Sequence, residues 1–169
     1  MRYIFREYNE INDEKSYDIS GSDYAKLIRY CATHASYFSL RKMHETTPVC
    51  ALLNQYTICP PPSCLETEPP YVYVYPNDNG APPPFQPYDI FYRVCFESVS
   101  ILIDKISSVF SYLWDEQHFN PPENLTFYRL DGSVLFSSVT HDGICWLTPK
   151  EYEEKPNSIL SEHWEINDL

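Results

Sequence analysis

Prolines restrict the fold of this chain more than any other feature, because they are concentrated in its middle. Eleven of the fifteen prolines lie between Pro48 and Pro87, and no lysine or arginine occurs between Lys42 and Arg93. Proline lacks a backbone N–H and interrupts helices and central strands. We therefore expect a proline-rich excursion over residues 59–87, packed on one domain in loop or polyproline II conformation. A disordered linker between two domains is the alternative.

Tyrosine and valine alternate inside this excursion, from Tyr71 to Tyr75. Strict alternation predicts a short strand, and the flanking Pro70 and Pro76 favour a position at the edge of a sheet. If the valines are buried, the three tyrosines face outward beside carboxylates. Packing of the tyrosines beneath the proline loops is an equally good interpretation.

Two segments outside the excursion have helical spacing of apolar residues. The first predicts a helix over residues 23–36, with Ser22 or Asp23 as N-cap, although residues 36–40 fit the start of a strand equally well. The second predicts a broad-striped helix that begins near Ser98 and follows a strand over residues 90–95. A start capped by Asp89 is the alternative for the second helix.

The last third of the chain predicts a meander of three strands. The strand over 125–129 and the strand over 134–140 flank Asp131-Gly132, which is typical of a hairpin turn. A second turn at 141–143 leads to a strand over 144–147. The capping-box pattern that begins at Thr148 then predicts a short acidic helix that ends before Pro156.

The two ends of the chain complete the expected fold. Residues 2–8 alternate as a strand, and the apolar residues within 158–169 are expected to fold back onto the body. The sequence thus predicts a single α+β domain over residues 1–169, with an antiparallel sheet packed against two main helices and the long proline-rich loop region. A secretory signal has a basic start followed by an apolar stretch, but this chain has charged residues at Arg6 and Glu7. We therefore expect a cytoplasmic protein.

The charge of the chain excludes several classes of partner. Twelve basic residues against 24 acidic ones give a net charge of −12. Nucleic-acid binding needs clustered lysine and arginine, and anionic membranes also attract basic segments. Four glycines provide no phosphate-binding loop, and no apolar run approaches the roughly 18 residues of a membrane span. The partners we expect are therefore basic proteins, with neither nucleic acid nor membrane involved.

Segments 121–133 and 136–142 resemble a group of small uncharacterised bacterial proteins. The similarity lies in Pro-Glu-Asn-Leu, then Phe-Tyr-Arg-Leu-Asp-Gly-Ser, then a strand that ends in His-Asp. The group has Asp and Glu where Asn124 and Asp142 stand here. The resemblance implies a bacterial cytoplasmic protein with an α+β fold. It implies no reaction, although small acidic proteins of this kind are often suspected immunity proteins.

A metal site would need cysteines and histidines at suitable spacing. Cys31 and His34 are three residues apart on the first expected helix, and Cys59 and Cys64 are the other candidates. Three prolines separate Cys59 from Cys64, and polyproline II would place these two about 15 Å apart. That separation disfavours a shared zinc ion and a disulfide alike. We therefore expect no metal and no cofactor.

A catalytic site is best sought at the turn that contains His141 and Asp142, with Cys145 two residues beyond it. A cysteine beside a histidine can act as an activated nucleophile. However, Asp and Gly favour turn positions, so a structural role in the turn explains His-Asp-Gly without catalysis. Cys145 lies beside Trp146 and is expected to be buried. Arg129 and Asp131 are interpreted as a solvated strand end and a turn residue, with a charged pair as the alternative.

These observations favour a non-catalytic bacterial protein-binding protein. Its expected form is an immunity protein that neutralises a basic toxin or effector. The alternatives are a small hydrolase that uses His141 and Cys145, and a scaffold that acts through the proline-rich loop. The candidate partner-binding residues are tyrosines and carboxylates, which suit an interface with a basic protein: Glu66, Glu68, Tyr71, Tyr73, Tyr75, Asp78, Glu151, Glu153 and Glu154.

Overall fold

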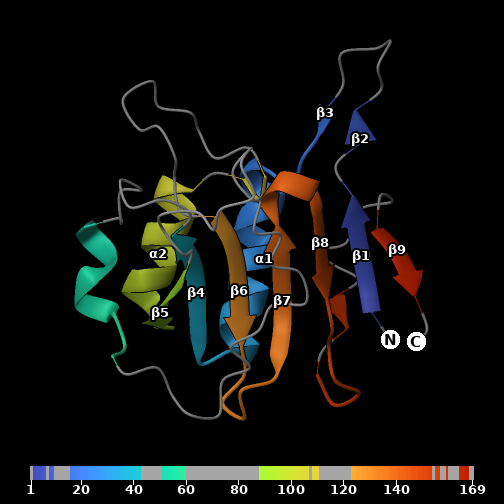
Figure 1. Ribbon diagram of the computed structural model, residues 1–169. Helices are drawn as coiled ribbons and strands as arrows, with labels where there is room; N and C mark the ends of the chain where they lie inside the picture. The colour runs from blue at the N-terminus through green and yellow to red at the C-terminus, as the bar shows by residue number, and fades with distance from the viewer. Residues whose placement is uncertain are drawn as a thin grey trace, which may run out of the picture.

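The protein folds into a seven-stranded antiparallel sheet with two main helices, as the α+β prediction requires (Figure 1). The computed structural model describes residues 2–6, 8–9, 16–42, 51–59, 88–106, 108–110, 123–153, 155–156, 159 and 164–167. The order of strands in the sheet is β5-β4-β6-β7-β8-β1-β9. The predicted excursion and its strand over 71–75 lie outside the described residues, apart from Cys59.

The strands of the main sheet are β1 (Arg2–Arg6), β4 (Tyr37–Lys42), β5 (Tyr88–Arg93), β6 (Glu123–Tyr128), β7 (Val134–Val139), β8 (Ile144–Leu147) and β9 (Trp164–Asn167). The remaining elements are α1 (Gly21–His34), α2 (Phe96–Lys105), the 3-10 helices η1 (Ala51–Tyr56) and η2 (Thr140–Asp142), and a two-stranded sheet of β2 (Tyr8–Asn9) and β3 (Ser16–Tyr17).

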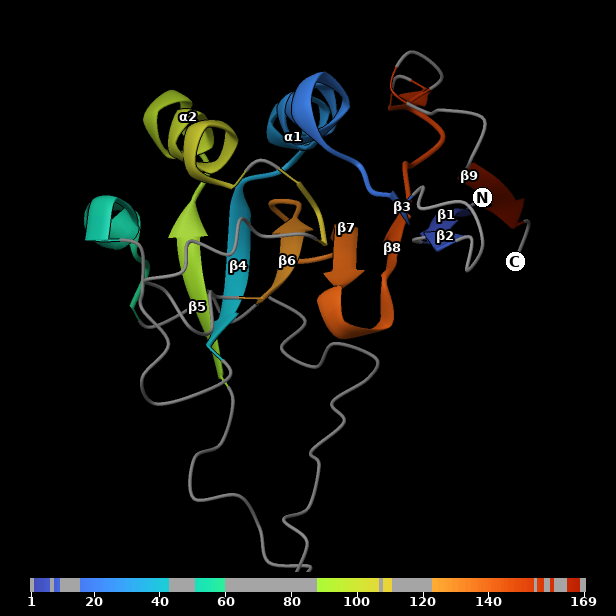
Figure 2. The ribbon, with the colours of Figure 1, turned by 90° about the horizontal axis from the view of Figure 1, so that it is seen from above.

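Both main helices lie on the same face of the sheet (Figure 2). The core fills the space between them, where Phe38 of β4 and Phe127 of β6 pack beneath the apolar side of the helices. The Tyr24 hydroxyl of α1 donates a hydrogen bond to the Leu102 carbonyl of α2 at 3.4 Å. The last turn of α1 forms one wall of the pocket described below.

Both helices begin earlier than the sequence pattern predicts. Helix α1 starts at Gly21 with Ser20 as its N-cap, so the assignment of the cap to Ser22 or Asp23 is wrong. The chain enters the helix through Gly21, whose φ of +55° is a left-handed conformation that glycine adopts at little cost. Helix α2 follows β5 as expected but begins at Phe96, where the Ser98 side chain accepts a hydrogen bond from the backbone of Cys95.

The meander of β6, β7 and β8 confirms the prediction for the last third of the chain. Gly132 and Gly143 both have positive φ in its two turns. Asn124, the second residue of β6, has a φ of +53°. Its side-chain oxygen accepts a hydrogen bond from the Thr140 backbone at 3.0 Å, and its own N–H donates to the Thr140 hydroxyl. These two hydrogen bonds connect the start of β6 to the residue that follows β7.

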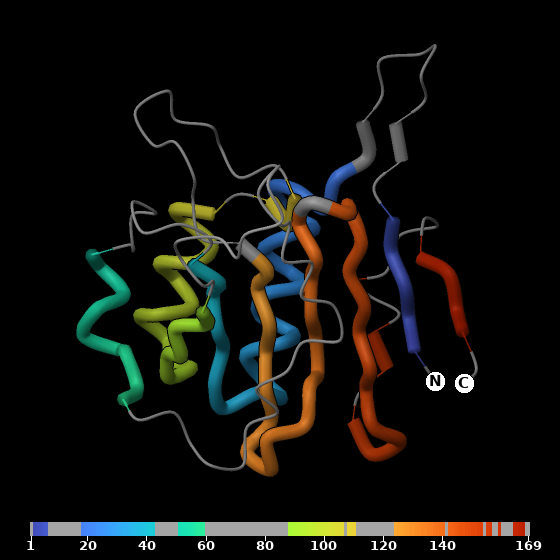
Figure 3. Tube along the Cα trace, in the orientation of Figure 1, coloured from blue at the N-terminus to red at the C-terminus, as the bar shows by residue number. Residues whose placement is uncertain are grey.

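The ends of the chain meet at one edge of the sheet, where β1 lies between β8 and β9 (Figure 3). The expected return of the C-terminal segment is confirmed, because Trp164 of β9 packs against Phe5 with ring centroids 5.5 Å apart. The acidic helix predicted after Thr148 does not form. The chain makes a turn over residues 151–153 instead, and this turn carries Glu153 into a buried ion pair.

Candidate functional site

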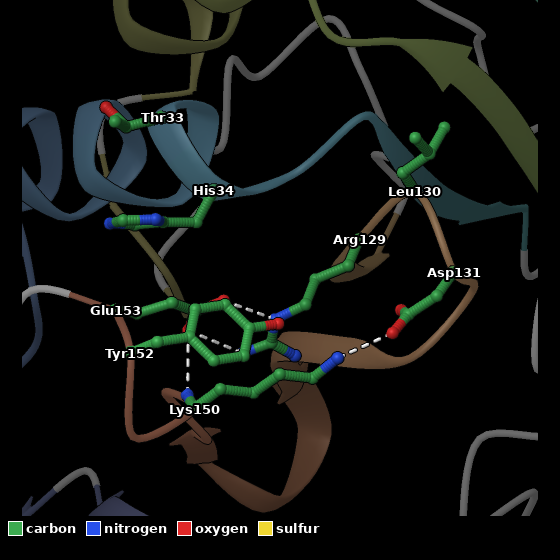
Figure 4. Close-up of a pocket in the computed structure, with 8 residues that line it drawn as sticks. All are labelled: Thr33, His34, Arg129, Leu130, Asp131, Lys150, Tyr152 and Glu153. Atoms are coloured by element: carbon green, nitrogen blue, oxygen red, sulfur yellow. Dashed lines mark hydrogen bonds and ion pairs between the residues drawn. The ribbon is translucent and has the colours of Figure 1, made fainter.

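A pocket of about 510 Å³ lies at the end of the sheet where three segments meet (Figure 4). These segments are the last turn of α1, the turn between β6 and β7, and the chain that leaves β8. The lining residues are Thr33, His34, Arg129, Leu130, Asp131, Lys150, Tyr152 and Glu153. The antiparallel meander brings these segments together, since β6 ends, β7 begins and β8 ends at the same side of the sheet.

The floor of the pocket is an ion pair between Arg129 and Glu153. Arg129 Nε donates to Glu153 Oε1 at 2.6 Å, and Nη2 donates to Oε2 at 2.8 Å. The two side chains are only 7% and 4% exposed. This two-point geometry is the strongest form of a guanidinium–carboxylate interaction. The interpretation of Arg129 as a solvated strand end is therefore wrong.

The remaining donors of Arg129 bind the backbone and a hydroxyl around it. Nη2 also donates to the Thr148 carbonyl at 2.6 Å, while Nη1 donates to the Val134 carbonyl at 2.9 Å and the Ser133 hydroxyl at 3.4 Å. A guanidinium has five N–H groups, and all five are engaged here. Arg129 thus joins the ends of three strands to the 151–153 turn, and it has no donor left for a bound anion.

Glu153 is held from two sides. Its Oε2 also accepts a hydrogen bond from the Lys150 backbone N–H at 2.8 Å, and its own N–H donates to the Lys150 carbonyl at 3.0 Å. Burial by itself would raise the pKa of Glu153, but the hydrogen bonds from Arg129 and Lys150 lower the pKa overall. Burial also acts to lower the pKa of Arg129, and the hydrogen bonds and charge of Glu153 reverse that effect. Both groups are charged at neutral pH.

A second ion pair lies at the mouth of the pocket, between Lys150 and Asp131. Lys150 Nζ lies 2.5 Å from Asp131 Oδ2 and 5.9 Å from the centroid of the Tyr152 ring. Asp131 Oδ1 accepts two more hydrogen bonds, from the backbone and the hydroxyl of Ser133. The bond from Lys150, followed by those from Ser133, holds the pKa of Asp131 well below its usual range.

Two large apolar side chains project from the rim of this pocket. Leu130 is 71% exposed and Tyr152 is 78% exposed. Both belong to turns that the pairs below them hold in place, Leu130 next to Arg129 and Tyr152 next to Glu153. We refer to Leu130 and Tyr152 as the rim. Tyrosine is enriched at protein interfaces, because it offers a large contact area and a polar tip.

The predicted partner-binding residues have different outcomes. Glu151 is exposed on the turn after β8, as a partner-binding residue must be. Glu153 is buried against Arg129, so it cannot contribute to an exposed acidic face. The other candidates, Glu66, Glu68, Tyr71, Tyr73, Tyr75, Asp78 and Glu154, lie outside the described residues.

Cys145, the nucleophile of the hydrolase alternative, does not have the environment of a nucleophile. Cys145 is fully buried, and burial raises the pKa of its thiol well above the usual value. A nucleophilic cysteine needs the opposite, an accessible thiol with a lowered pKa. Asp142 is exposed on η2, and the side chain of His141 lies outside the described residues.

The candidate metal ligands are also separated by burial. Cys31 is fully buried in the core, and burial raises the pKa of its thiol as well, whereas His34 lines the pocket. Cys59 is exposed, and Cys64 is not among the described residues. Within the described part of the chain, no group of three metal-ligating side chains is close enough to hold an ion.

Comparisons of the chain with protein-family models, with curated proteins and with solved structures found no match. No helix in the described ranges is long and apolar enough to cross a membrane.

Proposed function

We propose that this protein is a non-catalytic binding protein whose partner is a basic protein, and that it acts as an immunity protein against a bacterial toxin or effector. The observation that carries the proposal is the rim. Leu130 and Tyr152 are held outward above a pocket whose charged groups pair with one another. Such a surface offers apolar contact area on a fixed frame, which lowers the entropic cost of binding.

The charge of the chain supports a basic partner. At −12 the protein attracts cationic surfaces over a distance of about 8 Å at physiological salt. Long-range attraction raises the rate of association more than the final affinity. The rim then supplies the short-range contacts. An inhibitor of this design needs no chemistry of its own, because it acts by covering the functional surface of its partner.

The hydrolase alternative has less support than binding. It depends on Cys145, and the burial of this thiol denies a substrate access to it. The scaffold alternative depends on the proline-rich segment, which lies outside the described residues.

Co-expression with the products of neighbouring genes tests the proposal. We expect one of these products to co-elute with the chain in a stoichiometric complex during size-exclusion chromatography, and moderate salt to slow its association. The double variant Leu130→Ser/Tyr152→Ser should lose the complex. Ile166→Ser is the matched control, because Ile166 is also exposed but lies on β9 at the edge of the sheet. Failure of every neighbouring product to co-elute would contradict the proposal.

A further inference from the structure

The mouth of the pocket contains a cation site that the chain fills with its own lysine. Figure 4 shows the Lys150 ammonium between the Asp131 carboxylate and the Tyr152 ring. A carboxylate opposite an aromatic ring is a favourable environment for a cation, through ion pairing on one side and cation–π attraction on the other. The bound lysine therefore indicates the chemistry that this site accepts.

The lysine is held in a way that allows its replacement. The Lys150 side chain is 32% exposed and that of Asp131 is 56% exposed, so water reaches both groups. Exposed ion pairs are weak, because water competes for both charged groups. The buried pair below is different, since the five donors of Arg129 are already engaged and Glu153 is almost fully covered. Exchange of a cation is therefore easiest at Asp131.

We propose that Asp131 and Tyr152 form a receptor site for an arginine side chain of the partner, which displaces Lys150 from it. Arginine suits the site better than lysine, because its planar guanidinium can bind a carboxylate through two N–H groups and stack on an aromatic face. The exposed Leu130 lies next to Asp131 and offers apolar surface to the methylene stem of the incoming side chain. This inference depends on the proposed function and names the side chain through which a basic partner is recognised.

Lys150 therefore competes with the partner's arginine for Asp131 and Tyr152. Its removal should strengthen arginine binding, whereas a lysine with a purely structural role would give no such gain. The backbone N–H of residue 150, which holds Glu153, remains in a Lys150→Ala variant. The Asp131→Asn variant keeps the side-chain oxygen that the Ser133 backbone binds, so the turn is retained while the charge is lost.

The experiment is a titration of the 15N-labelled chain with N-acetyl-arginine amide, followed by 1H–15N spectra. N-acetyl-citrulline amide is the control, because it is a neutral analogue of nearly the same shape. We expect saturable chemical-shift changes at residues 130–131 and 150–153 with the arginine compound and none with the citrulline compound. Lys150→Ala should bind it about two- to five-fold more tightly, given the strength of an exposed ion pair. Asp131→Asn should abolish the shifts.

Lys26→Ala is the matched control variant, since Lys26 forms an exposed ion pair with Asp23 on α1. It should bind the arginine compound as the unaltered chain does. The inference is overturned if no saturable shifts occur, if citrulline produces the same shifts, or if Lys150→Ala leaves the affinity unchanged. The proposed function would survive such a result if the complex with a neighbouring gene product still depended on Leu130 and Tyr152.

Discussion

Replacement of Arg129 by methionine should be among the most destabilising substitutions in this chain. It leaves the Glu153 carboxylate buried without its counter-ion, and it removes the hydrogen bonds to the carbonyls of Val134 and Thr148. Removal of one partner from a buried ion pair costs about 3–5 kcal/mol. A domain of this size typically has about 5–15 kcal/mol of stability and loses about 2–4 °C in melting temperature per kcal/mol. We therefore expect a fall of about 6–20 °C for Arg129→Met.

Urea unfolding followed by circular dichroism measures this loss, and a double-mutant cycle separates the ion pair from simple packing. The double variant Arg129→Met/Glu153→Leu leaves no isolated charge, so it should be no less stable than Arg129→Met alone. The two single changes should then couple by at least about 2 kcal/mol. Two results would refute the reasoning: a loss below about 1 kcal/mol for Arg129→Met, or a double variant whose loss equals the sum of the single losses.

Three further predictions concern pH, backbone conformation and thiol chemistry. Because the folded-state pKa of Glu153 is below its ordinary value of 4.5, its stabilising contribution is present above that pH and is lost as pH falls through the folded pKa. Glu153→Gln should accordingly show a smaller loss of urea-unfolding stability than the unaltered chain between pH 5 and pH 3. Asn124→Ala should be less stable than Asn124→Gly by about 1 kcal/mol in the same assay, since glycine, unlike alanine, accepts the left-handed φ of +53° at little cost. Peptide mapping after brief iodoacetamide treatment should find Cys59 alkylated and Cys145 unmodified, and alkylation of both at equal rates would contradict the burial of Cys145.

The sequence predicted the strands and helices whose apolar residues recur at regular spacing. The meander of β6, β7 and β8 has alternating apolar residues and glycine at both turns, so its strands and their pairing follow from short-range rules. The cores of α1 and α2 follow from apolar spacing. Their starting residues did not follow, because the left-handed Gly21 and the hydrogen bond from the Cys95 backbone to Ser98 lie outside the spacing of apolar residues.

The pocket was much harder to predict. Its central pair joins residues 24 positions apart, Arg129 and Glu153, and no periodic pattern links them. The pattern after Thr148 satisfied the local rules for a helix, yet the pair to Arg129 stabilises a turn in its place. An arginine directly before a tight hairpin turn, with a run of carboxylates two strands later in the chain, is the only signal in the sequence that would have suggested the contact.

Binding of a basic partner at the rim is the central claim, and isothermal titration of the purified chain against a co-eluting neighbouring gene product tests it most directly. We predict one-to-one binding that weakens at least ten-fold in the Leu130→Ser/Tyr152→Ser variant, a change of about 1.4 kcal/mol. Binding by Ile166→Ser should be unchanged. Equal affinities for the rim variant and the unaltered chain would contradict the claim and would place the binding surface elsewhere on the protein.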